Sequence, residues 1–252
     1  MTYKDKDKDK DEEISRYDSR ALSILDEGEL AFENNIKTYL MDPYESYNEF
    51  LRNIPPKSNI LEIGAGMGEN TEYLLKLGHN LVSTDISPKS VEVMNRRFIK
   101  YKNFKAKFAD MEKLPFDSCF FDVVCSAGSL SYGDNIRVRD EIYRVLNTAG
   151  SFIAVDSLNN NLVYRLNRYI HYLLGNRSKS TLKRMPNLSL IKDYKDKFGV
   201  AEVKYFGSLT WLFPFLNLFM NDTNLKIMSK KFDKKFRIKG SAFKFTMKTT
   251  KL

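Results

Sequence analysis

The run Leu61–Gly68 places three alternating glycines directly after an apolar stretch. It predicts a β-strand over residues 59–63 that turns sharply into a helix over about 69–77, because glycines permit the turn and let the backbone approach a ligand without a Cβ clash. Asp85 closes a second apolar strand, over 80–84. A carboxylate at that strand tip is placed to accept hydrogen bonds from ribose hydroxyls. We therefore expect a nucleotide-like ligand.

The glycine spacing narrows the choice of ligand. A dinucleotide site would place a third glycine at position 69, where a helix N-terminus faces pyrophosphate, but Glu69 stands there and its carboxylate would repel that group. Glu62 is instead placed to meet a cationic amino-acid group. The pattern Glu62-x-Gly64-x-Gly66-x-Gly68 resembles the first motif of the class I S-adenosylmethionine-dependent methyltransferases. On the glycines alone, an ordinary α/β glycine turn remains open.

Further segments match that family in order. They are Ala-Asp-Met at 109–111 after a third strand, Phe-Asp-Val-Val-Cys-Ser at 121–126, and the helix-turn-strand at 141–152, in which the usual Lys-Pro-Gly-Gly turn is Asn-Thr-Ala-Gly. The resemblance implies an enzyme with S-adenosyl-L-methionine as cofactor and places Asp110 by the adenine amino group. The residues expected to bind the cofactor are Glu62, Gly64, Ala65, Gly66, Gly68, Asp85, Ile86, Asp110, Met111 and Ser126.

The resemblance also predicts the architecture. We expect an α/β fold with a Rossmann-like seven-stranded sheet, helices on both faces, an antiparallel last strand, and a helical cap between strands five and six. Apolar periodicity indicates the later strands at 151–155, 201–206 and 242–249. The expected domains are a disordered charged tail (1–16), an N-terminal helical lid (17–56), the cofactor-binding core (57–158), a substrate cap (159–199) and the completion of the sheet (200–252).

The tail and the lid are expected on different grounds. The Lys-Asp alternation at 4–11 is of low complexity and cannot build a core, so we expect it to fray. Residues 17–41 read as mixed helix. In this family such segments commonly fold over the cofactor, and the alternative is a helix packed against the sheet edge.

Charge is distributed unevenly along the chain. Residues 159–252 hold 20 Lys and Arg against 5 Asp and Glu, whereas the remainder holds 21 against 27, which together give the net charge of +9. A basic second half suggests an anionic partner: a phosphorylated or nucleotide-linked substrate, an RNA, or an anionic membrane surface. The alternative is a solvated lysine-rich face. The apolar run 211–220, with lysines after it, is expected to pack on the sheet or at a subunit interface rather than to dock on a membrane.

The predicted cap holds the candidate acceptor site. Arginine forks bind phosphate or carboxylate, and tyrosines stack on a sugar or base, so the expected substrate-binding residues are Tyr164, Arg165, Arg168 and Tyr172. The arginines could instead pair with the acidic core. The candidates for a catalytic base are His171, Tyr132 and Asp156. Their alternative roles are packing, a cleft wall and a cap.

The remaining features bound the function. Two cysteines and two histidines make no metal set, and the lack of a signal-like or membrane-spanning segment favours a cytoplasmic protein. Residues 126–129 lack the Asn/Asp-Pro-Pro-aromatic motif of nucleic-acid amino-methylating enzymes, so nucleic acid is disfavoured. We expect methyl transfer to a hydroxyl or phosphate oxygen of a small anionic metabolite, in a protein that could be a homodimer. Resemblance alone suggests a sugar, nucleotide-linked or phosphorylated precursor of a bacterial surface polysaccharide such as capsule. RNA methylation and a non-catalytic cofactor-binding scaffold are the alternatives.

Overall fold

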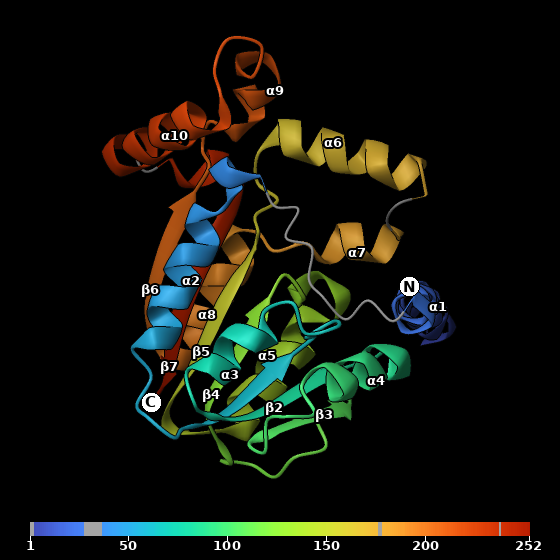
Figure 1. Ribbon diagram of the computed structural model, residues 1–252. Coiled ribbons are helices and arrows are strands. Elements are labelled where there is room, and N and C mark those ends of the chain that lie inside the picture. The colour runs from blue at the N-terminus through green and yellow to red at the C-terminus, as the bar shows by residue number, and fades with distance from the viewer. Residues whose placement is uncertain (1–2, 28–36, 176–177, 237) are drawn as a thin grey trace.

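The computed structural model describes residues 3–27, 37–175, 178–236 and 238–252. Its centre is one sheet in the strand order β3-β2-β1-β4-β5-β7-β6 (Figure 1). β1 to β5 pair in parallel, and β7 runs antiparallel to both β5 and β6, which confirms the predicted fold class. The strands are β1 Asn59–Ile63, β2 Asn80–Asp85, β3 Phe104–Phe108, β4 Phe121–Ala127, β5 Leu146–Ser157, β6 Gly199–Phe206 and β7 Lys244–Lys251.

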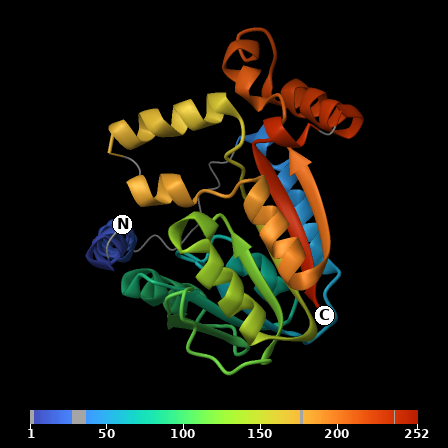
Figure 2. The same ribbon diagram turned by 180° about the vertical axis from the view of Figure 1, so that it is seen from behind.

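Helices cover both faces of the sheet, as predicted. One apolar cluster joins α2 (Asp42–Arg52), α3 (Thr71–Lys76) and α4 (Pro88–Arg97) to side chains such as Ile60 and the buried Cys125. A second cluster joins α5 (Asn135–Val145) and α8 (Leu188–Phe198) to the opposite face, seen from behind in Figure 2. Neighbouring strand residues therefore alternate between two buried layers, which is the pattern of a parallel sheet covered on both sides.

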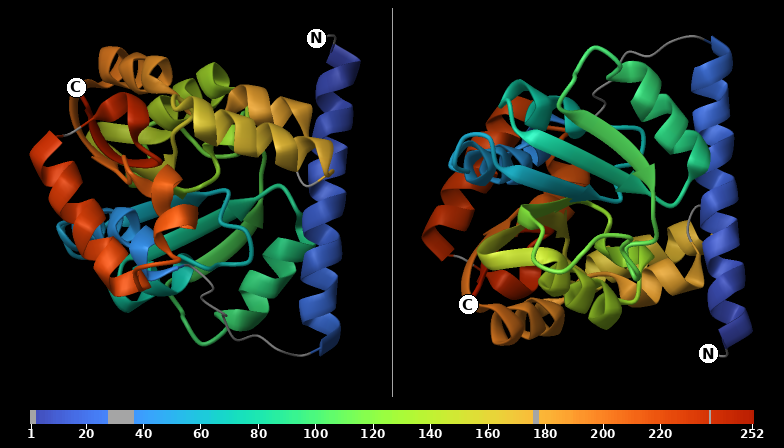
Figure 3. Two further views of the ribbon diagram at one scale, coloured as in Figure 1. Left: turned by 90° about the horizontal axis from the view of Figure 1, so that it is seen from above. Right: turned by 90° about the horizontal axis from the view of Figure 1, so that it is seen from below.

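The N-terminal segment corrects the expectation of a disordered tail. Tyr3–Glu27 forms a single helix, α1, which runs along one edge of the molecule (Figure 3). Ala21 is fully buried and packs with Met67 and Val93. Docking against the core thus outweighs the low complexity of the sequence.

The predicted cap is smaller than expected. α6 (Leu162–Leu173) and α7 (Lys179–Arg184) stand apart from the sheet, but α8 packs on α5, β6 and β7 and belongs to the core. The crossover between β5 and β6 therefore ends in an ordinary sheet-covering helix.

The last segment adds small helices to the two final strands. These are η3 (Thr210–Leu212), α9 (Phe213–Leu216), α10 (Asp222–Phe236) and η4 (Lys239–Ser241); η1 (Thr38–Leu40) and η2 (Leu130–Tyr132) occur earlier. Phe213 is buried, but three other apolar side chains of the run 211–220 are 68–84% exposed: Phe215, Leu218 and Phe219. The run therefore packs on the rest of the chain only in part, and its expected role at a subunit interface stays a prediction. Within the described ranges, no helix has the length and apolar character that crossing a membrane requires.

Candidate functional site

The glycine turn after β1 forms the floor of the site. Gly64 and Gly66 have φ values of +59° and +58°, in the left-handed region that favours glycine. A Cβ on Gly64 would lie 2.4 Å from Cβ of Ser129. The loops after β1 and β4 can therefore pack this closely only because residue 64 has no side chain. Gly68 has a different role. A Cβ there would lie 2.5 Å from the Phe98 ring, so this glycine lets α4 pack closely and does not line the cavity.

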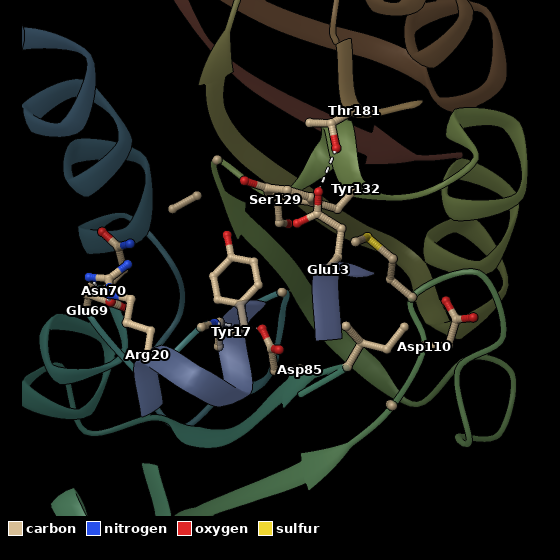
Figure 4. A pocket seen from close by; sticks show the side chains of 18 of the residues that line it. Glu13, Tyr17, Arg20, Glu69, Asn70, Asp85, Asp110, Ser129, Tyr132 and Thr181 are labelled. Atoms are coloured by element: carbon tan, nitrogen blue, oxygen red, sulfur yellow. Dashed lines mark hydrogen bonds and ion pairs between the residues drawn. The ribbon is translucent and has the colours of Figure 1, made fainter. Parts of the chain in front are cut away.

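A cavity of about 770 Å³ lies at the carboxyl ends of β1, β2 and β4, where ligands of open α/β sheets bind (Figure 4). Its volume falls within the range of roughly 300–1,000 Å³ that is usual for small-molecule sites. The cavity is lined by these sequence-predicted residues: Gly64, Ala65, Gly66, Asp85, Ile86, Asp110, Met111 and Tyr132. The predicted residues Glu62, Gly68, Ser126, Asp156 and those of α6 are not among the described residues that line it.

Asp85 stands at the tip of β2. Its Oδ2 accepts a hydrogen bond from Gly66 N at 2.8 Å, and its Oδ1 accepts one from Ser87 N at 2.9 Å. Burial raises the pKa of Asp85 to about 6, although these backbone donors favour its ionised form. Each carboxylate oxygen keeps a second lone pair for a hydroxyl donor. Asp85 therefore rigidifies the glycine turn and can still accept from a ribose.

Glu62 lies behind this turn rather than in the cavity. It is 1% exposed, and its Oε2 accepts hydrogen bonds from Thr71 Oγ1 at 2.6 Å and Ser83 Oγ at 2.7 Å. Burial raises the pKa of Glu62 to about 7. The expectation of direct contact with a cofactor amino group is thus corrected: Glu62 ties β1 to β2 and to the start of α3.

Ser126 and Asp156 support the opposite wall. Ser126 Oγ is 2.7 Å from the hydroxyl of Ser129, which does line the cavity and also donates to Ile63 O. Asp156 is 3% exposed and accepts hydrogen bonds from the backbone of Leu130 and Ser157. Burial raises the pKa of Asp156. Its position is that of a capping carboxylate for η2, so the structure does not place it as a base.

The residues predicted to hold the acceptor lie on α6, and none of them lines the cavity described above. The Tyr164 hydroxyl donates to Gly207 O at 3.0 Å, and Arg168 Nη1 donates to Leu158 O at 2.9 Å, so both side chains fasten the helix to the core. Arg165 and His171 are exposed, and Tyr172 is half-buried. Polar side chains turn inward on α6 because backbone carbonyls need donors, which corrects the prediction of an anion-binding face.

α1 supplies one wall that was missed. Lys10, Glu13, Tyr17 and Arg20 line the cavity from a single helix face. Their spacing of three and four residues was visible in the sequence and would have identified that face had the segment been read as a helix. Figure 4 shows Tyr17 near the centre of the cavity, above Asp85.

Contacts of α1 cross the cavity on both sides. Lys10 Nζ lies 2.5 Å from Asp110 Oδ2. Thr181 Oγ1 of α7 donates to Glu13 Oε1 at 3.1 Å (Figure 4). The Tyr17 ring meets the Tyr132 ring edge-on, with centroids 5.9 Å apart. Burial, with Tyr132 nearby, raises the pKa of Tyr17, so its hydroxyl stays protonated.

α7 supplies the facing wall. Ser180, Thr181 and Arg184 line the cavity, and Arg184 Nη1 reaches Tyr132 O at 3.5 Å. The cavity thus has a glycine-rich face formed by the sheet and a polar, aromatic face formed by α1, η2 and α7. In the part of the chain that is described, no group of three or more His, Cys, Asp or Glu side chains could hold a metal ion.

Comparison with known proteins points to one family. Residues 61–154 match the model of a methyltransferase domain. A sterol 4-C-methyltransferase of Caenorhabditis elegans is 34% identical over 105 residues, which cover 40% of this chain and 31% of that protein. A ubiquinone/menaquinone biosynthesis C-methyltransferase of Zymomonas mobilis is 26% identical over 178 residues, 62% of this chain and 74% of that protein. The chain therefore matches less than a third of the sterol relative's length.

A solved structure extends the likeness to the fold. Geranyl diphosphate C-methyltransferase of Streptomyces coelicolor, crystallised with S-adenosyl-L-homocysteine, superposes with a TM-score of 0.57 at 12% identity, over 83% of this chain and 79% of that one. The matched domain, the strand order and the glycine turn with Asp85 together identify residues 61–154 as a class I S-adenosylmethionine-dependent methyltransferase domain.

Proposed function

We propose that this protein transfers the methyl group of S-adenosyl-L-methionine to a hydroxyl or amine of a small polar acceptor. The observation that carries the proposal is the two-sided cavity, with a nucleoside cradle on the sheet face and an independent set of polar groups on α1 and α7 opposite it. A site that only stored the cofactor would have no need of the second face.

The residues present fit the cofactor. The left-handed Gly64 and Gly66 form the turn that lines the cavity with backbone, and Asp85 keeps lone pairs for the ribose. Ile86 and Met111 supply apolar lining beside the Asp110 carboxylate, which suits an adenine ring and its amino group. When bound, the cofactor supplies a methyl group already activated as a sulfonium. The chain's own residues then have to position the acceptor, exclude water and remove a proton.

Glu13 is the proposed proton acceptor. It is buried, lines the cavity and is held from both sides, by Thr181 and by an ion pair with Arg16. A carboxylate fixed in this way can accept a hydrogen bond from the acceptor and take its proton as the new bond forms. Tyr132 was the predicted candidate that lines the cavity, and it remains the second choice; Tyr17 and Tyr132 shape the space around the nucleophile.

Arg184 is the proposed binding residue for a negatively charged group on the acceptor. With Arg165 and Arg168 outside the cavity, Arg184 is the cavity arginine that stands on the acceptor side, opposite the sheet face. An anionic group on the acceptor, such as the phosphate of a surface-polysaccharide precursor, would bind there. The two relatives described above are named for sterols and for quinones, and neither name mentions a sugar. The proposal therefore commits to a small acceptor with a hydroxyl or amine and leaves its scaffold to experiment.

Transfer of label tests the function directly. The purified protein and methyl-labelled S-adenosyl-L-methionine are incubated with a size-fractionated cell extract, and Gly66→Arg serves as the control because its side chain would fill the cradle. We expect label in the small-molecule fraction with the natural protein alone. Label in the RNA fraction would favour RNA methylation, and tight cofactor binding without any transfer would favour a scaffold. The same preparation tests a homodimer by its mass in solution, and cell fractionation tests the cytoplasmic location.

Glu13→Gln tests the assigned proton acceptor. We expect kcat to fall by about 100-fold or more, because general-base catalysis typically contributes that much, while the affinity for the cofactor is unchanged. Glu72→Gln is the matched control, since Glu72 also lines the cavity but pairs with Lys76 at its margin. An unchanged kcat in Glu13→Gln would remove Glu13 from the chemistry.

A further inference from the structure

In α6 the polar face is turned toward the protein and the apolar face is exposed. Tyr164 and Arg168, one turn apart, are the side chains that face the protein. The opposite face, repeating at three and four residues, is apolar. Six of its side chains are 47–75% exposed: Leu162, Leu166, Tyr169, Ile170, Leu173 and Leu174. A helix that only covered the core would place these side chains inward.

A second apolar element lies on the same side of the molecule. Phe215, Leu218 and Phe219 project from α9 and the turn after it, and are 68%, 77% and 84% exposed. Seen from above, α6, α9 and α10 share one face (Figure 3, left). The stripe of α6 and these three side chains are referred to below as the apolar platform. A monomer seldom exposes this many large apolar side chains on one side without using them.

Basic side chains lie on the elements that carry the apolar platform and on the helices next to them, α7 and α10. Four exposed lysines lie along α10: Lys230, Lys231, Lys234 and Lys235. Arg165 of α6 and two lysines of α7, Lys179 and Lys183, are not buried either. The whole segment 159–252 holds 20 basic against 5 acidic residues. The covering partner must therefore be apolar at its centre and anionic around it.

We propose that the apolar platform docks on the surface of an anionic lipid bilayer. Leucine and phenylalanine side chains enter the acyl boundary, while lysines contact phosphate headgroups. The lysines decide between occupants, because lysine is depleted at protein–protein interfaces but is attracted to anionic membranes. A second copy of this chain would set the same positive charges against one another. This inference goes beyond the proposed methyl transfer and does not depend on it.

Vesicle binding tests the proposal. The full chain is sedimented with vesicles of phosphatidylglycerol or of phosphatidylcholine, in low salt and in about 0.5 M salt, where charge attraction is largely screened. We expect binding to phosphatidylglycerol that weakens with salt, and little binding to phosphatidylcholine. Leu166→Asp with Leu173→Asp, and separately Phe215→Asp with Phe219→Asp, should each lower the partition coefficient by about tenfold or more. Lys230→Gln with Lys234→Gln should lower the salt dependence.

The controls separate docking from folding. Ile99→Asp places the same charge at an apolar side chain that is 85% exposed outside the apolar platform, and should bind vesicles as the natural protein does. All variants should keep the thermal midpoint and the cofactor affinity of the natural protein, since the changed side chains are exposed. Equal binding by the platform variants and Ile99→Asp would overturn the proposal. So would a lipid-free dimer that Leu166→Asp dissociates, because the platform would then be an interface between copies.

Discussion

One carboxylate at the tip of β2 has to be ionised for two purposes. Asp85 accepts from the backbone of Gly66 and Ser87, and in the proposed complex it also accepts from ribose hydroxyls. Burial raises its pKa to about 6. A ligand whose hydroxyls donate to Asp85 binds the ionised form, so affinity should fall as the pH falls below 6. Between about pH 7 and pH 5 we expect a loss of about tenfold, measured by calorimetry with S-adenosyl-L-methionine.

Asp85→Asn and Asp85→Ala test the same role of Asp85 in cofactor binding. Asp85→Ala should weaken cofactor binding by about 1–3 kcal/mol through lost charge-assisted hydrogen bonds. Asp85→Asn should bind weakly with little dependence on pH in this range. A dissociation constant that stays flat from pH 7 to pH 5 in the natural protein would show that Asp85 does not contact the ligand.

Individual residues also mark where sequence reasoning succeeded. The left-handed Gly64 and Gly66 and the strand-tip Asp85 follow from local rules, since backbone conformation and strand position are local properties. Glu62 fits the same motif, but its side chain turns away, because Thr71 and Ser83 offer hydroxyl donors on the buried side of the turn. Which way a motif side chain points depends on neighbours that the motif does not contain.

At the scale of elements, the acceptor face depends on how α1 docks. Ala21 is fully buried at that contact and Asp18 Oδ1 accepts from Ser87 Oγ, so the C-terminal half of the helix is held by apolar packing and a hydrogen bond. Ala21→Asp should undock α1, because it buries an unpaired charge in a small separate cluster. We expect faster hydrogen exchange along α1 and a higher KM for the acceptor, with the sheet still folded.

Leu22→Asp is the neighbouring control for that variant. Leu22 is 42% exposed, so a charge there should leave both the exchange of α1 and the acceptor KM near those of the natural protein. If Ala21→Asp changed global stability but not acceptor KM, α1 would be a packing helix and not part of the acceptor site.

The cap shows that it is easier to predict a helix from sequence than to predict which of its faces packs against the protein. The expected cap between strands five and six contains α6, and spacing placed its arginines and tyrosines on one helix. The assumption that polar side chains face a ligand failed, because Arg168 supplies donors to the Leu158 carbonyl and the Asn159 side chain. α1 failed in the other direction, since charge alternation hid a helix whose docking partner lies far along the chain.

Arg168 therefore has a structural prediction. Arg168→Met should lower the free energy of unfolding by about 1–3 kcal/mol, because the Leu158 carbonyl loses its donor in a buried place. Chemical denaturation measures this change, and the KM for both substrates should stay unchanged. Arg165→Met, at an exposed position on the same helix, should alter neither quantity. A raised acceptor KM in Arg168→Met without loss of stability would restore its predicted role in binding.

Across the whole molecule, function is divided between two sets of elements. The sheet, α3 and α4 form a body whose loops hold the proposed cofactor cradle. The segments around it, α1, α6, α7, α9 and α10, form the proposed acceptor wall and the exposed lysine-rich face. The first set follows family rules of strand and turn. The second set has no local rule that fixes where each helix packs, which is why the sequence foretold the cofactor side better than the acceptor side.

At the scale of the whole molecule, the ionisation of Glu62 should make the free energy of unfolding depend on pH. Its pKa is about 4.5 in an unfolded chain and about 7 in the fold, where burial penalises its charge. Between these values the folded protein holds a proton that the unfolded chain has released, so the free energy of unfolding falls as pH rises, by at most about 3 kcal/mol over the window. Glu62→Gln stays neutral and its carbonyl can still accept from Thr71 and Ser83. The variant should therefore gain stability relative to the natural protein as pH rises from about 4.5 to 7, measured by urea unfolding at each pH. A difference between the two proteins that does not change with pH would mean that Glu62 is ionised in the fold throughout.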